Sequence, residues 1–165
     1  MAQIETERLV LRPFTPEDWS DVQELAVDWK AAPGPEFDKW PTSEDDTRGL
    51  TGHFADRPER FYAVALKSED KVIGLLSQNG FEVEGQMDLG HVILSTHQDD
   101  DLDREALRAM VRRVFENDDV ASIVTHNAPD HDQQLAPLRS LGFAEGGSSG
   151  ELVLTRNEWD ARQVD

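Results

Sequence analysis

The chain has 165 residues, enough for one compact domain spanning residues 1–165 and tight for two. Asp and Glu number 34 against 16 Lys and Arg, a formal net charge of −18, so the field of the protein repels nucleic acid and attracts cationic partners such as amines or basic peptides. There is no cysteine, which excludes disulfides, thiolate metal sites and a cysteine nucleophile.

The lengths of the apolar runs and the composition of the first residues indicate whether the protein enters or crosses a membrane. No run is long enough to span a bilayer, and the first residues lack the apolar core of a signal peptide, so we expect a cytoplasmic protein without a membrane partner. Abundant acid with few lysines also suits a protein that works in concentrated salt, where self-repulsion is screened. A halophilic protein and an ordinary acidic one both remain open.

The first half of the chain predicts a strand, two helices and a pair of strands. Thr15 and Pro16 are typical of a helix start, and Asp18 stands at the capping-box position. The expected elements, in order, are a strand at 9–14, helices at 15–29 and 43–55, and strands at 60–67 and 71–81.

The second half alternates strands and helices. The expected elements are strands at 86–94, 121–127 and 151–155, helices at 104–117 and 130–143, and a last helical turn at 156–163. Three consecutive strands followed by strand–helix–strand units imply an α/β fold, with one mixed sheet and helices on its faces.

The segment IETERLVLRPFTPEDWSDV, residues 4–22, resembles the N-terminal signature of the GNAT superfamily of N-acetyltransferases. The resemblance is to the branch that contains ribosomal-protein N-terminal acetyltransferases. Later stretches, KVIGLLSQNGF, DLGHVIL and PLRSLGF, are similar to segments of that family in the same order. The resemblance therefore covers nearly the whole chain.

The resemblance implies a GNAT fold, with a mostly antiparallel mixed sheet that is splayed between its fourth and fifth strands, and helices on both faces. It implies that acetyl-CoA binds in this opening and gives its acetyl group to an amine, either a peptide N-terminus or a small molecule. A homodimer is a further expectation. A non-catalytic binding or regulatory module that has lost CoA remains the alternative, because the donor site departs from the family pattern.

The departure lies in HQDDDLDREAL, residues 97–107. In the family, a turn of the pattern Gln/Arg-x-x-Gly-x-Gly/Ala holds the CoA pyrophosphate on backbone N–H groups at a helix start. Here Gln98 keeps the first position, but Asp101 and Asp103 replace the two small residues, and Asp99 adds a further acid. Carboxylates at these positions fill space, accept the N–H groups themselves and repel phosphate.

The resemblance places the rest of the donor at the end of the fourth strand of the family fold. Backbone N–H groups near Ile93, Leu94 and Ser95 would hold the pantetheine and polarise the thioester. Asn127 lies four residues before the position at which the family commonly has an asparagine in contact with the cofactor.

Acetyl transfer to an amine needs a group that takes the amine proton and donors that stabilise the developing oxyanion. The titratable candidates are Asp88, His91 and His131. Each has a structural alternative: Asp88 faces solvent or pairs with an arginine, His91 lines the core or a pocket, and His131 caps a helix. The only tyrosine is Tyr62, on an early strand, so the tyrosine acid of many relatives has no counterpart.

Aromatic residues between the first two helices are candidates for the acceptor site. Trp29, Phe37 and Trp40 would line an acceptor pocket, or else fill the core under these helices.

Two charged clusters have plainer interpretations. The side chains of HNAPDHD, residues 126–132, match no standard metal-ligand spacing, so no metal is expected. Arg108, Arg112 and Arg113 are interpreted as a solvated helix face, with a basic clamp for the cofactor as the other option.

Overall fold

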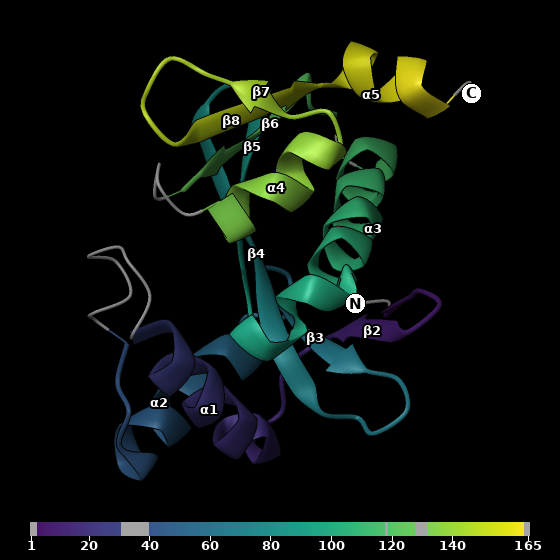
Figure 1. The fold of residues 1–165 in the computed structure, drawn as a ribbon. Helices are drawn as coiled ribbons and strands as arrows, with labels where there is room; N and C mark the ends of the chain where they lie inside the picture. The colour runs from purple at the N-terminus through teal and green to yellow at the C-terminus, as the bar shows by residue number, and fades with distance from the viewer. Residues whose placement is uncertain (1–2, 31–39, 118, 128–131, 164–165) are drawn as a thin grey trace.

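The computed structural model describes residues 3–30, 40–117, 119–127 and 132–163 (Figure 1). Strands in these ranges form one sheet in the order β1-β2-β3-β4-β5-β6-β8-β7. The strands are β1 (Ile4–Glu5), β2 (Leu9–Arg12), β3 (Phe61–Leu66), β4 (Val72–Val83), β5 (Gln86–Ile93), β6 (Ser122–His126), β7 (Ala144–Glu145) and β8 (Glu151–Thr155). The helices are α1 (Trp19–Lys30), α2 (Glu44–Ala55), α3 (Leu102–Asn117), α4 (Asp132–Ser140) and α5 (Arg156–Gln163), with 3-10 turns η1 (Pro16–Asp18) and η3 (Ser95–Asp100).

The predicted starts of the first two helices are confirmed, the first of them beginning as the 3-10 turn η1, whereas α3 begins two residues before the predicted position. The Asp18 carboxylate accepts the N–H of Thr15 at 2.8 Å, as a capping box requires, and it also binds the guanidinium of Arg12 at 2.9 Å. The Ser43 hydroxyl accepts the N–H of Asp46 at the start of α2. These local contacts fix the direction in which the chain leaves β2 and enters α2.

The sheet opens where the parallel pairing of β5 with β6 ends. β5 and β6 run parallel and pair from Gln86 with Ser122 to Leu89 with Thr125. Beyond Leu89, β5 continues to Ile93 in register with β4 alone. The predicted splay between the fourth and fifth strands of the family fold is therefore confirmed; it lies between β5 and β6 here because the two-residue strand β1 precedes the others.

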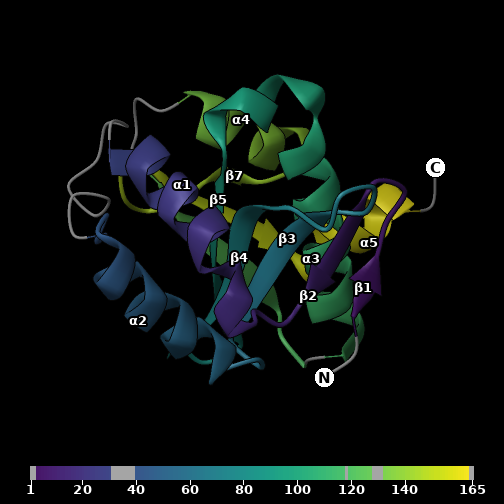
Figure 2. The ribbon, with the colours of Figure 1, turned by 90° about the horizontal axis from the view of Figure 1, so that it is seen from below.

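Helices cover both faces of the sheet, as expected for the α/β class (Figure 2). α1 and α2 lie on one face, where the ring centroid of Phe54 on α2 is 4.7 Å from that of Phe61 on β3. α3 lies on the other, and its apolar stripe, including Met110, Val111 and Val114, is fully buried. Burial of this stripe is the main force that holds α3 against the sheet.

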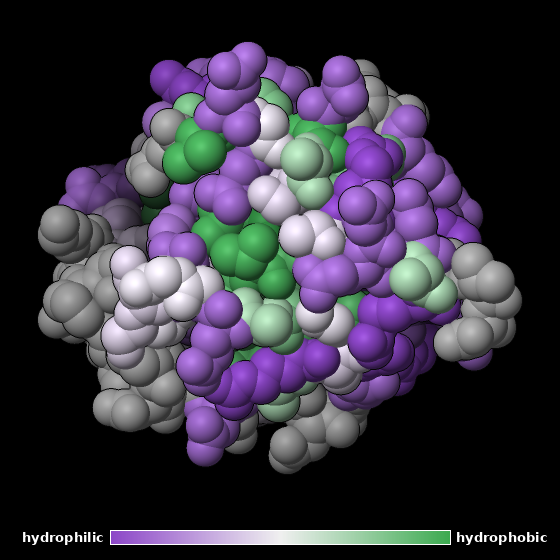
Figure 3. Space-filling model, turned by 90° about the horizontal axis from the view of Figure 1, so that it is seen from above, coloured by the Kyte–Doolittle hydropathy of each residue, from purple (hydrophilic) through white to green (hydrophobic). Residues whose placement is uncertain are grey.

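The strands β1 and β7 were not predicted. Each has two residues and exists only through its pairing with a neighbour, so neither carries a periodic pattern of its own. In the described part of the chain, no helix is long and apolar enough to cross a membrane. On the face seen from above, hydrophilic residues surround a hydrophobic area near the centre (Figure 3).

Candidate active site

The opening between β5 and β6 is the candidate site because it exposes strand backbone to one side. The N–H of Leu94 donates to the carbonyl of Ile73 on β4 at 2.8 Å. Since neighbouring residues of a strand direct their backbone groups to opposite sides, those of Ile93 point towards the opening. The Ile93 carbonyl there accepts the indole N–H of Trp29 at 2.7 Å.

α1 supplies a second contact at the same place. The Asp28 carboxylate accepts the Ser95 N–H at 2.9 Å and the Ser95 hydroxyl at 2.6 Å. The end of β5 is therefore fixed by two consecutive residues of α1, Asp28 and Trp29. No sequence pattern singles out Asp28, because α1 carries several acids and only the three-dimensional arrangement distinguishes this one.

Two predicted residues meet across the opening. His91 on β5 has its Nε2 atom 3.1 Å from the Oδ1 atom of Asn127, just after β6. The Asn127 amide also donates to the Thr125 hydroxyl at 2.9 Å and to the Gly150 carbonyl at 3.0 Å. Asn127 is thus held by three partners and positions His91 on the α3 side of the sheet.

Asp88 lies on the opposite face of the sheet from His91, because the two are three residues apart on one strand. Its carboxylate is 3.6 Å from the Nε2 atom of His126, at the end of β6; the Asp88 side chain is 16% exposed and that of His126 is 50% exposed. Asp88 and His91 are therefore not brought together. One partner of Asp88 is His126, which the sequence analysis considered only as a metal ligand.

A glycine leaves room on the Asp88 face. A Cβ atom at Gly90 would lie 2.5 Å from the Ser77 hydroxyl oxygen and 3.3 Å from the Asn79 side chain. The absence of a side chain at Gly90 thus allows a polar floor of Ser77 and Asn79 next to Asp88, at the edge of the opening.

At the start of α3, where the resemblance places the pyrophosphate, the side chain of Asp103 binds backbone N–H groups. Asp101 adopts the left-handed conformation, with φ of 63°, at the position of the first glycine of the family pattern. The Asp103 side chain is buried, and its carboxylate accepts the N–H of Arg104 at 2.8 Å and its own N–H. Burial raises the pKa of Asp103 to about 6, against the lowering effect of these N–H groups and with a further rise from the charge of Asp101.

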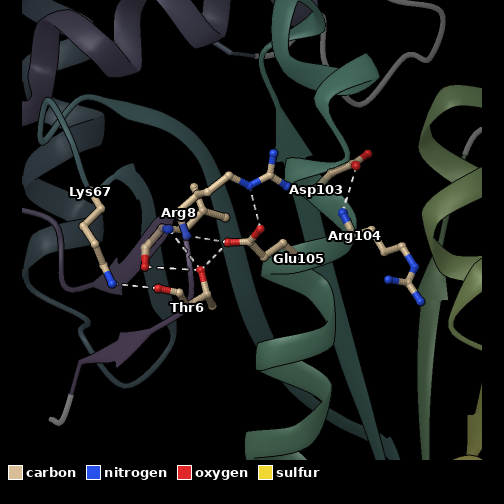
Figure 4. Close-up of polar contacts among 7 residues, drawn as sticks. Thr6, Arg8, Lys67, Asp103, Arg104 and Glu105 are labelled. Carbon is tan, nitrogen blue, oxygen red and sulfur yellow. Dashed lines mark hydrogen bonds and ion pairs between the residues drawn. The ribbon is translucent and has the colours of Figure 1, made fainter.

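Glu105, two residues further, is held in a different way (Figure 4). It accepts the Thr6 hydroxyl at 2.5 Å, the Arg8 N–H at 2.9 Å and the Arg8 side chain at 2.8 Å. Burial alone would raise the pKa of Glu105, but these hydrogen bonds lower it below the usual value. The Thr6-Glu7-Arg8 segment that carried the resemblance thus anchors the first turn of α3, a role the sequence analysis missed.

The other predicted site residues are placed as follows. Trp29 is buried, and its indole N–H donates to the Ile93 carbonyl at the site. Trp40 packs against the core, with its ring 6.4 Å from that of Phe54, which agrees with the core-filling alternative. Phe37 and His131 lie outside the described residues, as do the side chains of Gln98 and Asp99.

Across the described ranges, the structure contains no group of three or more His, Asp or Glu side chains that could hold a metal ion. The polar groups at the opening are instead hydrogen-bonded to one another and to the backbone.

Comparison with known proteins identifies the fold and the family. The family model of the Acetyltransferase (GNAT) domain matches residues 8–144. The chain belongs to the GNAT acetyltransferase family. The predictions of this family, of its fold and of an acetyltransferase are therefore confirmed, and the comparisons hold nothing that supports the non-catalytic alternative.

The relatives of the chain include other members of this family. It is 26% identical over 159 residues to an uncharacterized N-acetyltransferase, YnaD, of Bacillus subtilis, with 94% of this chain and 91% of the relative covered. A GNAT family acetyltransferase from Bacillus anthracis has a TM-score of 0.80 at 20% identity, over 95% of this chain and all of the other. The ribosomal L7/L12 acetyltransferase RimL, solved with coenzyme A, has a TM-score of 0.78 at 17% identity, over 95% and 99% of the two chains.

Acetyl-CoA fits one end of the site and not the other. At the β5 end, the strand backbone faces an opening without a β6 partner, as a pantetheine chain requires. At the α3 end, the Asp103 carboxylate holds the N–H groups that pyrophosphate would use. We call these backbone N–H groups at the start of α3 the backbone cradle; in this chain they are bound by the carboxylate of Asp103.

Proposed function

We propose that this protein transfers an acetyl group from acetyl-CoA to a primary amine, with a peptide N-terminus as the first candidate and a small cationic amine as the second. The observation that carries the proposal is the unpaired end of β5, flanked by Asp88 and His126. The ribosomal-protein acetyltransferase among the structural relatives supports a peptide acceptor. The net charge of −18 supports a cationic one.

When bound, acetyl-CoA would supply an activated acyl group. The N–H of Ile93 points towards the opening and is the candidate donor to the oxygen that gains charge during transfer. Asp88, mostly buried, is the candidate acceptor of the amine proton. His126, half exposed beside it, would pass that proton to water.

The polar floor next to Asp88 supports an amine rather than an apolar acceptor. Ser77 and Asn79 offer hydroxyl and amide oxygens to an ammonium group before it loses its proton. Gly90 keeps this floor open.

The proposal is tested by steady-state acetyl transfer from acetyl-CoA to a panel of N-terminal peptides and small amines. Asp88→Asn should lower kcat by about 100-fold or more, because the group that takes the proton is lost. The KM for acetyl-CoA should stay the same. Asp160→Asn, which removes an exposed acid on α5, is the matched control. Full activity in Asp88→Asn, or no transfer to any amine by the unaltered protein, would contradict the proposal.

A further inference from the structure

A groove of about 380 Å³ lies between α3, the end of α4 and α5, and its charged lining is entirely arginine. Arg104, Arg108 and Arg112 stand four residues apart on α3, and Arg162 comes from α5. We call this feature the arginine groove. In a chain with twice as many acids as bases, no Asp or Glu lines it.

Two of the four guanidinium groups are held in place by the end of α4. Arg104 donates to the Ser140 hydroxyl at 2.9 Å, and Arg162 donates to the Ser140 carbonyl at 3.1 Å. Gly142 has φ of 106°, and a Cβ atom there would lie 3.0 Å from the Arg162 side chain. The glycine that ends α4 thus provides the space in which Arg162 lies.

The other two arginines lack a strong internal partner. Among the residues that the structure describes, Arg108 has no hydrogen-bond or ion-pair partner. Arg112 has an exposed ion pair with Glu116 at 3.6 Å, and such a pair contributes little to stability. Like charges four residues apart on a helix repel each other and destabilise the helix. On one side these arginines share a neighbouring cavity with Asp101 and Glu105, whereas on the side of the groove only a bound anion would neutralise them.

The dimensions and chemistry of the arginine groove fit a nucleotide with more than one phosphate. At 1.5 Å per residue, the row from Arg104 to Arg112 extends about 12 Å along α3. Leu141 and Trp159 lie beneath the groove and are buried, so the surface that the groove presents to a ligand is polar and is made mainly by the arginines. Guanidinium groups bind phosphate oxygens through paired, charge-assisted hydrogen bonds.

The groove begins next to the closed cradle. Arg104 directly follows Asp103, whose carboxylate holds the backbone N–H groups at the start of α3. We propose that the arginine groove binds the phosphates of the nucleotide end of CoA, with the 3′-phosphate at Arg108 and Arg112, in place of the backbone cradle that Asp103 fills. This inference rests on the proposed function, since it assigns the second half of the same donor.

The test compares CoA with dephospho-CoA, which lacks the 3′-phosphate, by calorimetry at low salt. The unaltered protein should bind CoA about tenfold more tightly than dephospho-CoA, because charge-assisted hydrogen bonds to the extra phosphate are lost. In the double variant Arg108→Gln with Arg112→Gln, this preference should disappear. Equal preference in the variant and the unaltered protein would overturn the inference.

A matched control separates local contacts from net charge. Arg57→Gln with Arg60→Gln makes the same change in net charge on exposed residues far along the sequence from the groove, and it should keep the tenfold preference. A loss of preference in this control as large as in the groove variant would contradict a local site. Both residues of the groove variant are exposed and their removal relieves repulsion along α3, so its unfolding midpoint should not fall below that of the unaltered protein.

Further ligands distinguish the sources of phosphate and the two proposals. If 3′,5′-ADP binds as tightly as CoA while inorganic tripolyphosphate does not, the groove recognises the CoA nucleotide; tight binding of tripolyphosphate with no preference for CoA overturns the assignment. Acetyl transfer with an unchanged CoA preference in the groove variant would defeat this inference alone. No transfer and no CoA binding by the unaltered protein would defeat the proposed function as well.

Discussion

The two ends of the donor site depend on different kinds of structure. At the β5 end, the opening follows from strand order, because β5 outlasts its parallel partner β6. At the α3 end, a binding site would consist of a few backbone N–H groups, and one carboxylate, that of Asp103, is enough to fill it. The opening at β5 depends on strand order and therefore tolerates many substitutions. The anion site at the start of α3 depends on free backbone N–H groups, and a single side chain can occupy it.

The strand end is most sensitive to substitution of Gly74, which lies opposite Ile93. A Cβ atom there would lie 2.5 Å from the Val92 backbone oxygen, so Gly74→Ala should lower the free energy of unfolding by about 2–4 kcal/mol in urea titrations. Gly49→Ala, on α2 with no atom within 4 Å of the added carbon, should instead raise it by about 0.5–1 kcal/mol. A neutral Gly74→Ala would show that the end of β5 is not tightly packed on β4.

The helix end depends on Glu105. Glu105→Gln weakens three hydrogen bonds from Thr6 and Arg8, and should lower the free energy of unfolding by about 1–2 kcal/mol near neutral pH. Folding lowers the pKa of Glu105 below its ordinary value. The ionised Glu105 therefore stabilises the fold at pH values above that ordinary pKa, and this contribution is lost as the pH falls through the folded-state pKa. Glu116→Gln, with one exposed ion pair on the same helix, should change stability by less than about 0.5 kcal/mol.

Asp103 should show the opposite dependence on pH, although it lies on the same turn. Its pKa is raised from 3.8 to about 6, so ionisation destabilises the folded state progressively as pH rises between these values. Asp103→Asn should therefore raise the free energy of unfolding at pH 8 by about 1 kcal/mol, a value reduced because solvent partly screens the carboxylate. It should have no such effect below pH 4. Thermal unfolding of both proteins across pH 3–8 measures the difference; parallel curves would contradict a buried carboxylate.

The sequence predicted most helices and strands and the fold class, but few of the side-chain contacts within the site. Periodicity and capping residues such as Ser43 located the helices, because those signals are local. The sequence pointed to Asp101 and Asp103, and the structure shows the Asp103 carboxylate accepting backbone N–H groups at this turn; that the turn has lost its affinity for phosphate stays a prediction. The contacts of Asp28 with Ser95 and of His126 with Asp88 join segments that are distant in sequence or on different strands, so no local pattern announces them.

The central claim is that the chain keeps the pantetheine end of the donor site and closes the pyrophosphate cradle with its own carboxylate. The most direct test is the affinity of the double variant Asp101→Gly with Asp103→Ala for CoA and for pantetheine, measured by calorimetry and ligand-observed NMR. Removing two carboxylates beside the phosphates should tighten CoA binding by about tenfold, and leave the binding of pantetheine, which has no phosphate, unchanged. Unchanged CoA affinity, or an equal gain for pantetheine, would contradict the claim.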